Sequence, residues 1–170
     1  MDTTPLRDAC RSLLDAATEV ATRADNPAPP DGEWSADQIL AHVSVVTAAT
    51  IVTAATVAAG ANATYDNRHA QDTWTLTRVA ERAGGNAGLR ERIRAQVDAL
   101  CTLGGEPGLG EAELDTLVPA LLLSNDALML DQPITLRDIL TGLAEAELPG
   151  HTKQLLALMP SHVGAQACAT

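Results

Sequence analysis

Two histidines and one glutamate are the side chains in this sequence whose types and spacing best suit metal binding. His42 lies in an otherwise apolar stretch, whereas Glu147 and His151 lie four residues apart near the end of the chain. If that second stretch is helical, the separation of four places both side chains on one face with neighbouring Cβ atoms. One imidazole from one helix and a carboxylate–imidazole pair from another would supply three protein ligands. Three protein ligands and an open fourth position are the arrangement of catalytic zinc sites.

Each of these residues also has an ordinary structural explanation. A single histidine on an apolar helix face is more often a core or boundary residue than a metal ligand. Glu147 and His151 on their own would more often belong to a solvated polar face near a helix break, because Pro149 and Gly150 stand between them. Proline lacks an N–H and crowds the preceding turn, so the helix is expected to kink or restart there.

Residues 65–74 form the densest cluster of polar and aromatic side chains in the sequence. Arg68 could bind a carboxylate through two parallel hydrogen bonds, and His69 could act as an acid or a base. Gln38 stands one turn before His42 and could orient its ring or contact a substrate. These three residues are the candidates for substrate binding. The simpler alternative is a capped helix start with surface charges for the cluster, and a capping role for Gln38.

Helical periodicity predicts the elements that must position these side chains. Apolar residues recur at steps of three and four in four long segments, which predict an all-α, up-down four-helix bundle. A capping box formed by Ser35 and Gln38 predicts the start of the second helix, and Gly60 predicts its end. Thr135 is the predicted cap of the last helix. The four predicted segments are about 6–24, 35–59, 66–103 with a break at Gly84–Gly85, and 135–158.

A change of period precedes the last helix. Two short apolar runs, 118–123 and 127–130, flank a turn-forming trio at residues 124–126. This pattern predicts a short β-hairpin or two extended arms. We expect residues 1–160 to form one helical domain and residues 161–170 to form a flexible tail, because the tail has no periodicity.

Composition excludes several classes of function. The chain has 170 residues and a formal net charge of -11, so a nucleic acid or an anionic membrane surface would be repelled. The longest apolar stretch, 43–63, is rich in Ala and Thr, which favours a buried helix over a membrane span. The three cysteines are widely spaced and include no C-x-x-C pair, which predicts neither a disulfide framework nor a thiolate zinc site. We expect a reduced, cytoplasmic protein.

Residues 34–43, Trp-Ser-Ala-Asp-Gln-Ile-Leu-Ala-His-Val, resemble the motif that opens the second helix of DinB-like (YfiT-type) four-helix proteins. Residues 135–140, followed by Glu147, His151 and Gln154, look like the last helix of that family. The resemblance spans about residues 6–158. It implies a divalent metal, commonly zinc or nickel, bound by one His of the first motif and an H-x-x-x-H pair of the last helix. These positions correspond to His42 and His151, and Glu147 replaces the first His of the pair.

A His, Glu, His set is the arrangement of the related mycothiol-dependent maleylpyruvate isomerases. The composition, with a single Lys, also looks like that of an actinobacterial protein, and mycothiol is an actinobacterial thiol. The resemblance therefore implies a metal-dependent S-transferase or isomerase that uses a low-molecular-weight thiol and a small electrophilic substrate. A metal-dependent hydrolase at the same site, and a non-enzymatic binding or scaffold protein with a decayed site, remain as alternatives. Association into a homodimer is left open.

Overall fold

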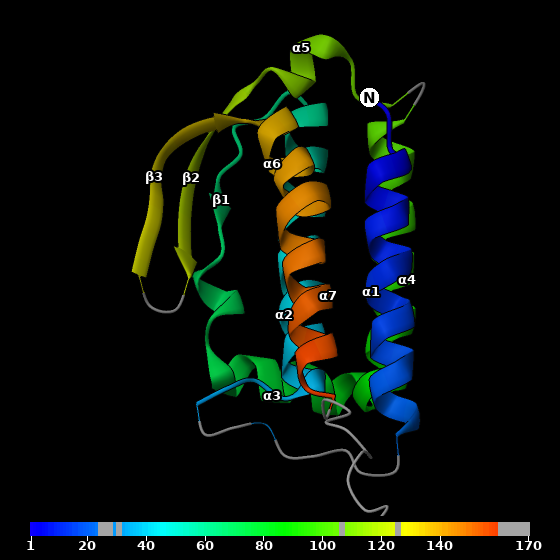
Figure 1. The fold of residues 1–170 in the computed structure, drawn as a ribbon. Coiled ribbons are helices and arrows are strands. Elements are labelled where there is room, and N and C mark those ends of the chain that lie inside the picture. The colour runs from blue at the N-terminus through cyan, green and yellow to red at the C-terminus, as the bar shows by residue number, and fades with distance from the viewer. Residues whose placement is uncertain (24–28, 30–31, 106–107, 125–126, 160–170) are drawn as a thin grey trace, which may run out of the picture.

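A computed structural model describes residues 1–23, 29, 32–105, 108–124 and 127–159. These residues are mostly helical and carry a small mixed three-stranded sheet at one side of the helices (Figure 1). The predicted flexible tail, 161–170, lies outside the described residues. In chain order the elements are α1 (Thr4–Thr22), α2 (Ala36–Ala58), β1 (Tyr65–Asp66), the 3-10 turn η1 (Arg68–Ala70), α3 (Thr73–Ala83), α4 (Gly85–Gly104), α5 (Glu111–Leu114), β2 (Leu117–Ser124), β3 (Ala127–Thr135), α6 (Leu136–Gly142), the π-helical turn η2 (Leu143–Glu147) and α7 (Leu148–Ala157).

Four long helical segments, α1, α2, α4 and the continuous α6–η2–α7, pack against one another around an aliphatic core. α1 contacts α4 and α7, and α2 contacts α3, α4 and α7 (Figure 1). Leu, Ile, Val and Ala dominate the buried positions, as the near absence of aromatic residues requires. Side chains of this size allow helices to approach closely, which brings residues of α2 within reach of α7.

α2 is a core helix, and it carries His42. The predicted capping box is confirmed: the Ser35 hydroxyl accepts a hydrogen bond from the Gln38 backbone N–H, and the Gln38 side chain accepts one from the Ser35 N–H. The predicted end is confirmed by Gly60, whose φ of +71° is unfavourable for other residues. α2 is long and apolar enough to cross a membrane, but 61% of its most apolar window is buried inside the protein.

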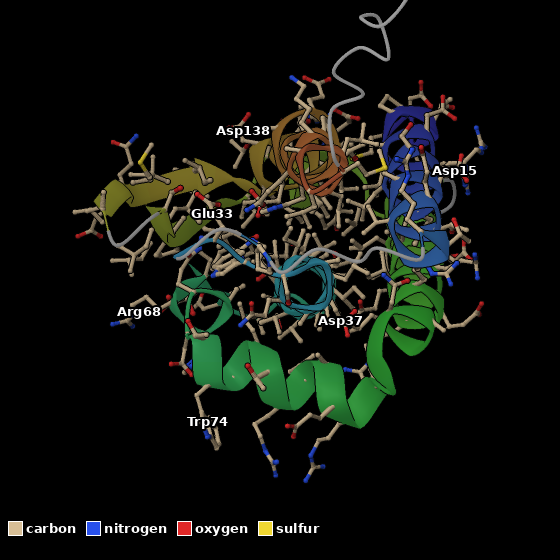
Figure 2. All side chains as sticks on the ribbon, turned by 60° about the horizontal axis from the view of Figure 1, so that its bottom comes forward. Asp15, Glu33, Asp37, Arg68, Trp74 and Asp138 are labelled. Atoms are coloured by element: carbon tan, nitrogen blue, oxygen red, sulfur yellow. The ribbon has the colours of Figure 1, made fainter. Side chains whose placement is uncertain are left out.

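The third helical segment starts later than the sequence predicts. Asp66 pairs with Leu121 in a parallel contact between β1 and β2, and α3 begins only at Thr73, after Asp72 has capped it. A two-residue strand leaves no periodic signal, which is why the prediction of a helix from residue 66 was wrong. The break before α4 is confirmed, since Gly84 adopts a φ of +82° and ends α3. Figure 2 shows Arg68 and Trp74 projecting away from the helices near this segment.

The predicted hairpin is confirmed and is part of a larger sheet. β2 pairs with β3 in antiparallel register, and the sheet order is β1-β2-β3. The register shifts between Leu122 and Leu123. At this point the side chain of Asn67 forms two hydrogen bonds with the backbone of Leu123. Its Oδ1 accepts the Leu123 N–H at 2.8 Å, and its Nδ2 donates to the Leu123 carbonyl at 2.9 Å. The hairpin is thereby tied to the turn η1.

The last helical segment contains a π-helical turn just before its proline. The predicted cap is confirmed, since the Thr135 side chain accepts a hydrogen bond from the Asp138 N–H. In η2 the Leu148 N–H donates to the Leu143 carbonyl, five residues back. Pro149 has no backbone N–H and cannot donate the next helical hydrogen bond. The π-helical turn therefore lies next to the position where the regular α-helical hydrogen bonds are interrupted. The sequence predicts a kink or a restart at Pro149; the structure has a π-helical turn just before this residue, and α7 continues through Pro149 and Gly150.

Candidate metal centre

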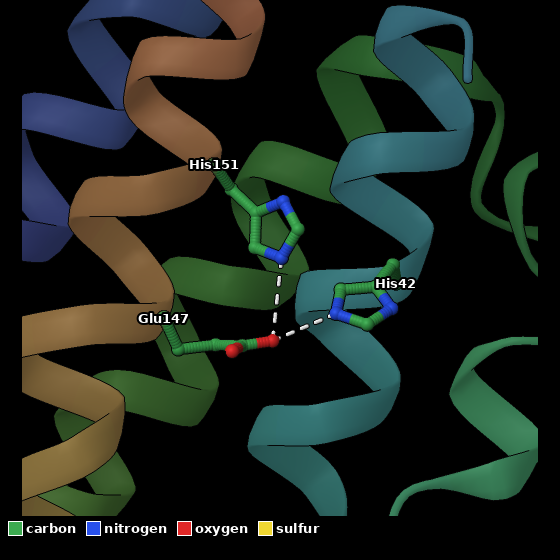
Figure 3. A group of neighbouring side chains, drawn as sticks. All are labelled: His42, Glu147 and His151. Atoms are coloured by element: carbon green, nitrogen blue, oxygen red, sulfur yellow. Dashed lines mark hydrogen bonds and ion pairs between the residues drawn. The ribbon is translucent and has the colours of Figure 1, made fainter. Parts of the chain in front are cut away.

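The three predicted ligands meet between α2 and the last helical segment (Figure 3). His42 Nε2 lies 2.7 Å from Glu147 Oε1, and His151 Nε2 lies 3.2 Å from the same oxygen. One ligand atom from each residue can be chosen so that all lie within 4.8 Å of one another. The two imidazole rings are neighbours, with centroids 4.5 Å apart and planes tilted by 56°. The structure therefore brings together a group that could hold a metal ion.

The orientation of the His42 ring is set by the backbone of η1. His42 Nδ1 lies 2.7 Å from the carbonyl oxygen of Ala70. A carbonyl can only accept a hydrogen bond, so Nδ1 carries the proton and, in a neutral ring, Nε2 carries the lone pair. That lone pair faces a carboxylate oxygen, which also needs a donor or a cation. A metal ion between these atoms would satisfy both of them, and metal-ligating histidines typically donate their other ring N–H to a carbonyl in this way.

The His151 ring has an equivalent partner on its own helix. His151 Nδ1 lies 2.9 Å from the side-chain oxygen of Gln154, three residues further along α7. With Nδ1–H donating to this amide, the Nε2 lone pair again faces Glu147. Both histidines thus present the same nitrogen to one central carboxylate. Two imidazole nitrogens and one carboxylate oxygen are a ligand set that zinc accepts.

Glu147 is the charged member of the group, and its side chain is about one-third exposed. Burial by itself would raise the pKa of Glu147, but in the metal-free protein hydrogen bonds from His151 and His42, each donated by Nε2–H when its ring is protonated, outweigh burial and hold this pKa well below its usual value. The carboxylate therefore stays ionised at neutral pH. It is the last residue of η2, so the π-helical turn sets how far this carboxylate reaches toward α2.

A cavity of about 440 Å³ opens onto the three side chains. Trp34 forms part of its wall, and its ring centroid lies 4.9 Å from that of His42. Much of the remaining wall is polar and includes Asn67, Gln71, Gln154, Glu33 and residues 123–124 of the hairpin. A small molecule can therefore reach the open side of the proposed centre.

The three predicted substrate-binding residues are not among those that line this cavity. Arg68 is exposed and forms an ion pair with Asp66. His69 is exposed on the outer side of η1, and the Gln38 side chain is used in the α2 cap. From the same segment the structure instead brings Asn67 and Gln71 to the cavity. No sequence signal distinguished them, because both amides face the cavity through their hydrogen bonds to Leu123 of the hairpin, which is more than 50 residues away in the sequence.

Replacing Gln154 with Leu is expected to weaken zinc binding by about 10- to 100-fold, because loss of the hydrogen-bond partner frees the ring it orients. Gln154→Glu should retain tight binding, since a carboxylate also accepts the His151 Nδ1–H. Competition with a fluorescent zinc chelator measures both affinities, and Lys153→Ala serves as the control at a neighbouring exposed position. Equal affinity of the Leu variant and the wild type would show that Gln154 has no part in the centre.

Comparison of the chain with protein-family models, with curated proteins and with solved structures gives no match. The evidence for a function is therefore the geometry of His42, Glu147 and His151 and of the cavity beside them.

Proposed function

We propose that this protein is a metal-dependent enzyme that transfers a low-molecular-weight thiol to a small electrophile or uses the thiol to isomerise it. The single observation that carries the proposal is the shared orientation of His42 and His151, whose Nε2 atoms face the same Glu147 oxygen. Two neutral rings would place both lone pairs against the carboxylate, and a metal ion bound by all three side chains would relieve this repulsion, as a second proton on each ring would in the metal-free protein. The arrangement matches the three-ligand pattern of catalytic zinc sites.

The fold is consistent with the DinB-like four-helix group. The motif at residues 34–43 lies at the start of α2. The motif at residues 135–140 lies at the start of α6, in the segment that carries Glu147 and His151. We infer that α1, α2, α4 and α6–η2–α7 are the four helices of such a bundle. In this interpretation the hairpin and the turn η1 are additions, and Leu123, Ser124, Asn67 and Gln71 from these parts of the chain line the cavity.

The ligand set determines what the site can do. A divalent cation held there supplies a Lewis acid that favours a thiolate over a thiol at neutral pH. Glu147 contributes one negative charge, so a divalent ion held by the three side chains would keep a net positive charge that favours one thiolate. Trp34 and the amides of Asn67 and Gln71 would position the electrophile beside it.

The reaction balances without a redox partner. In transfer, the thiol sulfur forms a bond to the electrophilic carbon, and the bond from that carbon to its leaving group breaks with its electron pair. The thiol proton departs with the leaving group. In isomerisation, the carbon–sulfur bond forms by addition to an unsaturated substrate and breaks again by elimination after bond rotation, so the thiol is regenerated.

Metal analysis and an adduct assay test this proposal. Untagged protein is expected to contain close to one equivalent of zinc or nickel and to accelerate formation of a sulfur adduct between mycothiol and monochlorobimane, detected by its mass. Protein that stays metal-free even after zinc supplementation would favour the scaffold alternative. Metal-containing protein that cleaves a test ester or amide but forms no adduct above the spontaneous rate would favour a hydrolase.

A further inference from the structure

A second cavity adjoins the one above the candidate centre. Its volume is about 240 Å³, and it shares five lining residues with the first, among them Asn67, Leu123 and Glu147. Its own part of the wall comes from α2, the hairpin and the α6–η2 segment. The side chains there are largely aliphatic: Val46, Leu122, Met129, Ile134, Ile139 and Leu143. The two cavities therefore differ in polarity: amide side chains line the first cavity, beside the candidate centre, and mostly apolar side chains line the second cavity.

No side-chain cation lines either cavity among the described residues. All eleven Lys and Arg residues of the chain are among the residues that the structure describes, so the statement covers every Lys and Arg of the chain. The charged groups of the two walls are carboxylates, namely Glu33, Asp138 and Glu147. For a substrate with two or more negative charges, a metal ion at the centre would be the one cationic partner in these cavities. The formal net charge of -11 on the chain would also repel such a substrate.

We propose that the two cavities bind one substrate that has an uncharged polar head at the centre and an apolar arm against the inner face of the hairpin. This inference rests on the proposed function, since it places the reacting head beside His42, Glu147 and His151. It narrows that function: the electrophile is a neutral molecule with an alkyl or aryl arm, and di-acids are poor substrates. Asn67 marks the boundary, because its side chain is held in place by Leu123 and lines both spaces.

Gly142 provides a way to close the second cavity without touching the centre. It lines that cavity, has an ordinary helical φ of -59°, and would place an added Cβ within 4 Å of no other group. Helical side chains lean toward the preceding turn, where Asp138 and Ile139 also line the cavity. Gly142→Leu should therefore fill the space, and Gly142→Ala is the matched control that leaves it open.

Zinc-loaded protein is titrated by calorimetry with three hydroxamates, whose common head binds the metal. Acetohydroxamate has no arm, hexanohydroxamate has an alkyl arm, and adipic monohydroxamate has an arm ending in a carboxylate. The arm of hexanohydroxamate has four more methylenes, each of which strengthens binding about three- to four-fold when buried. Hexanohydroxamate should therefore bind on the order of 80- to 250-fold tighter than acetohydroxamate. The carboxylate-ended arm should lose most of this gain. Gly142→Leu should abolish the gain and keep the affinity for zinc and acetohydroxamate, whereas Gly142→Ala should behave as the wild type.

Equal affinity for the short and long hydroxamates would overturn the inference while leaving the proposed function intact, and so would tight binding of the carboxylate-ended arm. A Gly142→Leu protein that still prefers the long arm would overturn the placement of that arm. Failure of the wild type to take up zinc would overturn the proposed function and, with it, this inference.

Discussion

His42→Ala protein is expected to bind zinc more than about 100-fold more weakly than the wild type and to lose thiol transfer with it. Loss of a hydrogen-bond partner behind a ligand costs about 10- to 100-fold, and this substitution removes a ligand itself. It also removes the side-chain partner of the buried Ala70 carbonyl and one of the two histidine partners of Glu147. We expect this to lower the free energy of unfolding of the metal-free protein by about 1–3 kcal/mol. Chelator competition and chemical denaturation measure the two effects.

A second histidine serves as the control for this experiment. His69 is exposed and is not among the residues that line the cavity, so His69→Ala removes the same functional group without touching the centre. Its zinc affinity and stability should match those of the wild type. Circular dichroism establishes that both variants keep their helices. If His42→Ala protein stays folded and retains thiol transfer, the His42, Glu147, His151 centre is not the site of the reaction.

Glu147→Gln is expected to produce the second large effect, a fall in zinc affinity of at least about 100-fold. The amide keeps the size of the side chain but removes the negative charge that faces both histidines. Glu147→His should restore affinity to within about 10-fold, because an imidazole at this position again gives three ligands. Glu145→Gln makes the same charge change at an exposed position two residues away and should bind zinc as the wild type does. Equal zinc affinity of the Glu147→Gln variant and the wild type would exclude the carboxylate as a ligand.

The same variant tests the electrostatics of the metal-free protein. The pKa of Glu147 in the folded state lies below its ordinary value of 4.5, so its ionised form is favoured by folding. Its contribution to stability is therefore fully present above about pH 4.5 and is lost as the pH falls through the folded-state pKa. The difference in unfolding free energy between wild type and Glu147→Gln should shrink as the pH falls below about 4.5. Denaturation curves at several pH values in a chelator-treated buffer measure this difference.

The charges around the centre link these predictions to substrate choice. A single carboxylate ligand leaves a divalent ion with net positive charge, enough for one thiolate. Among the described residues, no lysine or arginine lines either cavity. Further anionic groups on a substrate would therefore have no cationic side chain to pair with there. Among the reactions that the proposed function allows, transfer of the thiol to a neutral electrophile therefore agrees best with the cavity.

Local sequence patterns determined the start and end of α2, the break before α4 and the start of α6, together with the positions of the candidate ligands on their helices, but they placed the start of the third helical segment too early. The capping box at Ser35, the stop at Gly60 and the cap at Thr135 could be predicted because each depends on hydrogen bonds between residues at most a few positions apart. The spacing of Glu147 and His151 could be interpreted in the same way, since it depends only on helical rotation.

Only the tertiary structure decided which groups meet at the centre. His42 and Glu147 are 105 residues apart, and the Ala70 carbonyl that orients the His42 ring comes from a turn 28 residues away. It also decided that Asn67, rather than Arg68, faces the cavity, because its side chain pairs with the hairpin. Contacts of this kind depend on how helices and sheet pack together, and periodicity carries no information about the distance between elements that are remote in sequence.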